Sequence, residues 1–90
     1  MTMEEQQVLL RAIKKYGGEP QMRMAMEECA ELIVALSHHL RARCQIADVI
    51  SEIADVEIMI EQLKLIFDAF DEVGRERTRK VERLRMKLDA

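Results

Sequence analysis

Five acidic residues in two short segments are the part of this sequence best suited to chemistry. Glu27, Glu28 and Glu31 form the first segment, and Glu52 and Asp55 follow after a gap of 20 residues. Residues three apart are neighbours on a helix surface, so each segment can present a pair of carboxylates to one side. Carboxylates that converge repel one another and raise one another's pKa. A hard divalent cation relieves that repulsion, and all-oxygen ligation suits Mg²⁺, with Mn²⁺ as a substitute.

The composition predicts that helices position these carboxylates. Of the 90 residues, 49% are hydrophobic, 34% are charged and only 3% are aromatic, with three glycines and one proline. So few aromatic and turn-forming residues argue against an all-β fold, which needs both. The length predicts a single domain over residues 1–90. Because a chain this short buries a modest fraction of its surface, self-association is also expected.

Apolar periodicity predicts four helices joined by short links, and therefore an all-α, four-helix antiparallel bundle. Thr2 caps the first helix, and Gly17 ends it after Tyr16. The second helix has Pro20 in its first turn and continues to about residue 41, and we place the next link near 42–46. The third helix is the most apolar. The fourth covers about 72–88, with Asp68 or Asp71 as its N-cap.

The charges of the third helix divide into two sides. Glu57 belongs to a stripe that faces solvent, whereas Glu52 and Asp55 project to the opposite side, together with apolar Met59 and Leu63. Two carboxylates are therefore expected to point into the bundle, which costs several kcal/mol unless each is paired, hydrogen-bonded or bound to a cation. Salt bridges to Arg41, to Arg43 or to the basic segment 75–87 are the alternative to a metal ion.

The acidic pattern resembles the E-E-x-x-E … E-x-x-D signature of the MazG-type all-α nucleoside triphosphate pyrophosphohydrolases. Glu27-Glu28-Cys29-Ala30-Glu31 matches its first half and Glu52-Ile53-Ala54-Asp55 its second. The resemblance extends over nearly the whole chain, from Lys15-Tyr16-Gly17 before the first motif to Lys80-Val81-Glu82-Arg83-Leu84 near the end. It implies a helical bundle that dimerises or tetramerises, with pockets completed by neighbouring subunits.

The activity that the resemblance implies is hydrolysis of (deoxy)nucleoside triphosphates between the α and β phosphates. Glu28, Glu31, Glu52 and Asp55 would then be the Mg²⁺ ligands. Glu27 would have a supporting role, either beside the ligands or in orienting the attacking water.

The resemblance also suggests residues that bind the substrate. Lys80 matches a lysine thought to hold phosphate, and Arg83 follows it on the same helix face. Tyr16 and Gln21 are candidates for contact with the base. Family members often have Trp where Tyr16 stands, so the identity of the base stays open.

Two other functions share these features. Phosphoribosyl-ATP pyrophosphohydrolase has the same acidic signature, and a helical interaction module could keep the fold without catalysis.

Nucleic acid is not an expected partner, because the net charge is −3 and the basic segment 75–87 has no aromatic residues. No apolar run approaches the length of a membrane span, so we expect a cytoplasmic protein. Cys29 is expected to be buried, and His38, His39 and Cys44 match no standard zinc spacing.

Overall fold

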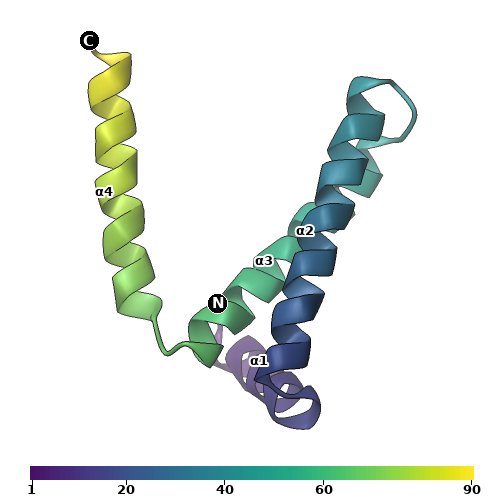
Figure 1. Cartoon of the computed structure of the whole chain (residues 1–90), viewed down its shortest axis with the longest axis vertical. Coiled ribbons are helices and arrows are strands. Elements are labelled where there is room, and N and C mark those ends of the chain that lie inside the picture. The colour runs from purple at the N-terminus through teal and green to yellow at the C-terminus, as the bar shows by residue number, and fades with distance from the viewer.

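The computed structural model describes residues 1–90 and contains four helices and no strand (Figure 1). The prediction of an all-α chain with four helices is therefore confirmed. In chain order, the helices are α1 (Met3–Tyr16), α2 (Gly18–Leu40), α3 (Ile46–Ile66) and α4 (Phe70–Leu88). None of them combines the length and the hydropathy that a membrane-spanning helix requires.

The first two helices are separated by a single residue. Thr2 caps α1 as predicted, because its Oγ1 accepts a hydrogen bond of 3.0 Å from the backbone N–H of Glu5. Gly17 then adopts a φ of 95°, a conformation that glycine reaches without strain. Pro20 lies in the first turn of α2, where its missing N–H costs nothing. The chain can thus end α1 and begin α2 within one residue.

Helices α2 and α3 form an antiparallel hairpin, and this pair makes by far the most extensive helix–helix contact in the chain (Figure 1). Ala25 on α2 and Val49 and Met59 on α3 are its buried apolar residues. The connecting loop covers 41–45, in agreement with the predicted link. At its end, the N–H of Gln45 donates a hydrogen bond of 3.1 Å to Oδ2 of Asp48, which fixes the start of α3.

Helix α4 stands away from the hairpin, so the chain has the outline of a V (Figure 1). Its only helix–helix contact is with α3. The turn between them passes through Asp68, whose φ of 50° is left-handed and is tolerated better by Asp than by most residues. The N-cap of α4 is Ala69, so the prediction that Asp68 or Asp71 caps this helix was wrong. Asp68 instead redirects the chain before the helix begins.

Little of the chain is buried. Only five of the 90 residues are buried, and the radius of gyration is 15.7 Å, against about 12 Å for a compact domain of this length. Cys29, predicted to be buried, is exposed. The reason is that the apolar stripe of α2 is wider than the surface that α3 covers, and one edge of it remains open.

Candidate metal centre

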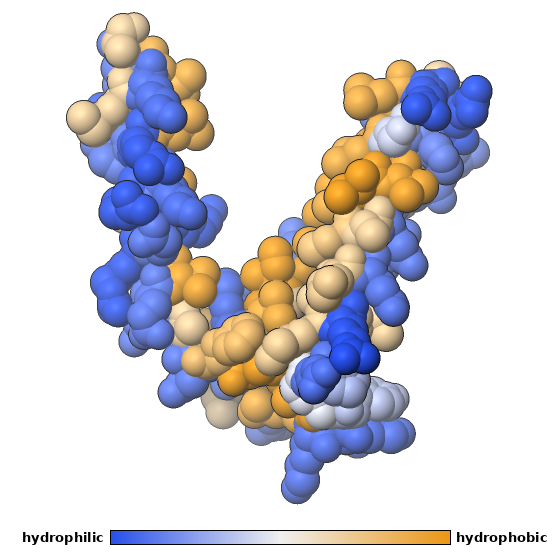
Figure 2. All heavy atoms as spheres, viewed as in Figure 1, coloured by the Kyte–Doolittle hydropathy of each residue, from blue (hydrophilic) through white to orange (hydrophobic).

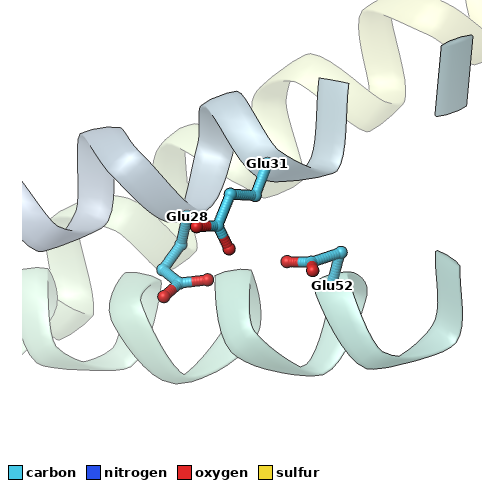
Figure 3. A group of neighbouring side chains, drawn as sticks. All are labelled: Glu28, Glu31 and Glu52. Atoms are coloured by element: carbon cyan, nitrogen blue, oxygen red, sulfur yellow. The ribbon is translucent and has the colours of Figure 1, made fainter. Parts of the chain in front are cut away.

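Three of the predicted ligands lie together at the middle of the α2–α3 hairpin. Glu28 and Glu31 extend from α2 and Glu52 extends from α3, and all three side chains point into the space between the two helices (Figure 3). One carboxylate oxygen from each residue lies within 4.8 Å of the others. This is the one group of three or more acidic, His or Cys side chains in the chain that is close enough to hold a metal ion.

Two of these carboxylates are only partly solvated. The Oε2 atoms of Glu28 and Glu52 are buried and have no hydrogen-bond partner. Burial raises the pKa of Glu28 above its usual range, and the negative charges of Glu31, Asp55 and Glu52 raise it further. Burial also raises the pKa of Glu52, followed by the charges of Glu31 and Asp55. The site therefore attracts protons or cations.

Asp55 and Glu27, the remaining acidic residues of the pattern, occupy different positions. Asp55 is half-buried, one turn after Glu52 on α3, and it is close enough for its charge to raise the pKa of both Glu28 and Glu52. Glu27 is exposed and lies outside the group of three. Asp55 also lies outside the group of three, so the structure brings together three of the four predicted ligands and leaves Asp55 beside them.

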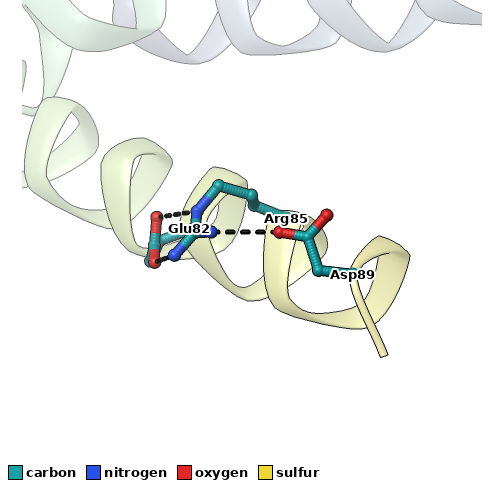
Figure 4. Close-up of polar contacts among 3 residues, drawn as sticks. All are labelled: Glu82, Arg85 and Asp89. Carbon is teal, nitrogen blue, oxygen red and sulfur yellow. Dashed lines mark hydrogen bonds and ion pairs between the residues drawn. The ribbon is translucent and has the colours of Figure 1, made fainter.

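No basic side chain neutralises this cluster within the chain. Glu28, Glu31, Glu52 and Asp55 take part in none of the ion pairs. Several arginines of α4 instead pair with acidic residues of the same helix or of its C-cap, as Arg85 does with Glu82 and with Asp89 (Figure 4). The alternative of salt bridges from the link or from the basic segment is therefore not realised in this structure.

The predicted phosphate-binding residues are not brought to the carboxylates. Lys80 and Arg83 lie on α4, where both are exposed and neither takes part in an ion pair. Since α4 stands away from the α2–α3 hairpin, the side chains of Lys80 and Arg83 do not reach the carboxylates of the same chain in this conformation (Figure 1).

The two candidates for base contact are placed differently from each other. Tyr16 is the last residue of α1 and is 58% exposed, with the ammonium of Lys15 at 5.4 Å from its ring centre. Gln21 is buried, and its Nε2 donates a hydrogen bond of 2.8 Å to Oε1 of Gln62. That amide is therefore already engaged. The sequence analysis did not single out Gln62, although it lies seven residues after Asp55 and hence on the same face of α3.

A cleft of about 430 Å³ opens beside the carboxylates. Glu31 and Glu52 form its inner end, and its walls extend along α2 and α3 toward the connecting loop. The other lining residues are Ala30, Val34, Ala35, His38, Cys44 and Asp48. Cys44 is held in place by donating its S–H to the carbonyl of Ala35, with a separation of 3.5 Å. The cleft is half apolar and ends at an imidazole, which suits an aromatic or heterocyclic group.

No protein-family model, no curated protein and no solved structure matches this chain.

Proposed function

We propose that this protein is a Mg²⁺-dependent nucleotide pyrophosphohydrolase that cleaves nucleoside triphosphates between the α and β phosphates. The observation that carries the proposal is the convergence of Glu28, Glu31 and Glu52 between two helices, with Asp55 next to them. The resemblance of the acidic pattern to the MazG-type signature supplies the reaction.

The donor set fits a hard divalent cation. Every ligand atom is a carboxylate oxygen, and two of these oxygens are buried without a partner, which is unfavourable unless a proton or a cation reaches them. Glu28, Glu31, Glu52 and Asp55 would hold the ion. When bound, Mg²⁺ supplies polarisation of the phosphate oxygens and a more acidic water molecule.

The chain's own carboxylates can move the proton that hydrolysis releases. Water adds its oxygen to phosphorus, the bond between that phosphorus and the bridging oxygen breaks, and one proton must leave the water. A carboxylate at the edge of the metal site would accept that proton. Glu27 is exposed beside Glu28 and would assist in orienting the water. The products are the nucleoside monophosphate and pyrophosphate.

The cleft offers a place for the nucleoside. His38 lies seven residues after Glu31 on α2, which is two helical turns and about 10 Å along the axis on the same face. A nucleotide whose phosphates lie at the carboxylates would thus extend its base toward His38. In the opposite direction along α2, toward its N-terminus, Gln21 is buried and hydrogen-bonded. The space beside the carboxylates is therefore more open on the side of the cleft.

The test is pyrophosphate release from a panel of nucleoside and deoxynucleoside triphosphates and phosphoribosyl-ATP, with Mg²⁺ and with EDTA. We expect Mg²⁺-dependent pyrophosphate from one or a few triphosphates. The Glu52→Gln and Asp55→Asn variants should lose this activity. Glu57→Gln, an exposed glutamate of the same helix, is the matched control and should keep it.

The other outcomes separate the rival functions. Turnover of phosphoribosyl-ATP alone would identify a histidine-synthesis enzyme, and orthophosphate in place of pyrophosphate would contradict the cleavage position. No turnover and no effect of Mg²⁺ on stability would favour a non-catalytic interaction module.

A further inference from the structure

The outer end of the cleft, toward the loop that joins α2 to α3, carries a polar side chain on each wall. On α2, His38 follows Glu31 by seven residues, which is about 10 Å along the helix axis. On α3, Asp48 precedes Glu52 by four residues, or about 6 Å. Because the two helices are antiparallel, both residues lie on the same side of the carboxylate cluster. A base that extends from phosphates at the cluster therefore meets His38 on one wall and Asp48 on the other.

The carboxylate of Asp48 is held in place by the start of α3. Its Oδ2 accepts the 3.1 Å hydrogen bond from the N–H of Gln45, and the side chain takes part in no ion pair. The other oxygen, Oδ1, is not used by this bond. An ionised carboxylate accepts hydrogen bonds and donates none. Asp48 thus presents an acceptor in a fixed position.

Little else at this end of the cleft can donate a hydrogen bond. The S–H of Cys44 is directed to the carbonyl of Ala35, and no lysine or arginine lines the cleft. The neutral imidazole of His38 has one donor and one acceptor. The other lining residues, apart from the carboxylates of the cluster, are alanines and a valine, and hydrophobic atoms are also gathered along the hairpin arm in Figure 2. The cleft therefore distinguishes bases chiefly by the acceptor that Asp48 presents.

The bases of nucleotides differ in what they offer to such an acceptor. Cytosine and adenine carry an exocyclic amine, which donates hydrogen bonds, whereas uracil and thymine carry a carbonyl oxygen at the corresponding position. An amine can donate to the carboxylate of Asp48. A carbonyl oxygen in the same place would face the carboxylate acceptor to acceptor, and both would lose the water that they bind when free.

We propose that Asp48 selects nucleotides whose base carries an exocyclic amine over those that carry a carbonyl oxygen in its place. The inference rests on the proposed hydrolysis, and it names the substrates that this site prefers. Asp48 would contact the base and not the reacting phosphates, so it sets specificity and takes no part in the cleavage.

The test compares substrates that differ at this position of the base. We expect kcat/KM to be about tenfold higher for CTP than for UTP, and for ATP than for ITP, which is the effect of about one hydrogen bond to a charged group. Asp48→Asn keeps a carbonyl oxygen for the N–H of Gln45 and turns an amide NH₂ toward the cleft, which can donate to the carbonyl oxygen of uracil. In this variant the ratio of CTP to UTP should fall to about one or below.

A matched control separates specificity from a structural role. Asp71→Asn changes an aspartate in the first turn of α4, as Asp48→Asn does in the first turn of α3, and it should leave the ratio unchanged. If Asp48 only supported the start of α3, Asp48→Asn would lower the activity toward CTP and UTP alike. An unchanged ratio in Asp48→Asn would therefore overturn the proposal.

Binding measured without turnover separates this inference from the proposed function. The α,β-methylene analogues of CTP and UTP have a carbon bridge in place of the oxygen at the cleavage position, so calorimetry with Mg²⁺ reports their affinity alone. We expect the CTP analogue to bind about tenfold more tightly. Equal affinities in a protein that hydrolyses triphosphates would overturn the selection by Asp48 and leave the proposed function standing. No binding of either analogue and no hydrolysis would overturn the proposed function, and this inference with it.

Discussion

The side-chain amide of Gln21 donates a 2.8 Å hydrogen bond to Oε1 of Gln62, and this pair sets the register of the helices that carry the carboxylates. Both residues are buried. Gln21 precedes Glu28 by seven residues and Gln62 follows Asp55 by seven, so the pair lies two turns from the acidic cluster on both helices. Sliding one helix past the other would break the bond and separate the carboxylates.

Removing one partner of this pair should destabilise the protein. Gln62→Ala leaves the Gln21 amide buried without its acceptor, which costs about 1–3 kcal/mol. The measurement is the free energy of unfolding in urea. Gln7→Ala, at an exposed glutamine of α1, is the matched control. It should change the free energy of unfolding by less than about 0.5 kcal/mol.

A double-mutant cycle distinguishes this loss from a general effect of truncation. The Gln21→Leu/Gln62→Leu double variant should be more stable than the sum of its two single variants predicts, because no buried polar group is left unpaired. If the changes in the free energy of unfolding of the two single variants simply add in the double variant, the hydrogen bond does not itself contribute to stability.

Magnesium should stabilise the folded protein. An ion that binds only the folded state at 100 times its Kd adds about 2.7 kcal/mol to the free energy of unfolding. Urea denaturation with MgCl₂ and with EDTA measures this difference. Glu52→Gln and Asp55→Asn should abolish it, and Glu57→Gln should not. Equal Mg²⁺ stabilisation in all three variants would mean that the ion binds somewhere else.

The helices and the convergence of the acidic residues could be predicted from the sequence because both follow from local rules. Apolar periodicity marks four helices, and Thr2 marks the first N-cap. Glu52 and Asp55 share a helix side with apolar Met59, which is enough to point them inward. Short links then bring α2 and α3 together as a hairpin.

The position of α4 could not be predicted in this way. It depends on the left-handed turn at Asp68 and on how much surface remains uncovered, and neither has a local signature. For the same reason, the burial of Cys29 was wrongly predicted. Helical periodicity shows that a residue lies on an apolar face, but it does not show whether the chain itself covers that face.

Without metal, the stability of the protein should fall as the pH rises above the usual carboxyl range. The pKa values of Glu28 and Glu52 are raised above their ordinary value of 4.5 in the folded state. Between the ordinary and the raised value, the folded state binds more protons than the unfolded state, so the free energy of unfolding decreases with increasing pH. Above the raised pKa values, both carboxylates are ionised in the folded and the unfolded state, and the free energy of unfolding stops falling with pH.

Denaturation in EDTA across this pH range measures the effect. Glu28→Gln should be more stable than the wild type at neutral pH, and the difference should shrink as the pH falls to the ordinary carboxyl value. Saturating Mg²⁺ should reverse the order at neutral pH, because the wild type keeps its full ligand set. A difference that is independent of pH would show that the substitution acts through packing and not through charge.

Replacing His38 should weaken substrate binding more than catalysis. The imidazole lines the outer part of the cleft, about two helical turns from Glu31, so it would contact the base and not the reacting phosphates. For His38→Ala, we expect the KM of the preferred triphosphate to rise about fivefold, which corresponds to about 1 kcal/mol, with little change in kcat. His39→Ala is the matched control, because His39 is exposed and does not line the cleft. Mg²⁺ stabilisation should be the same in both variants. A fall in kcat at unchanged KM would instead place His38 near the phosphates and the base outside the cleft.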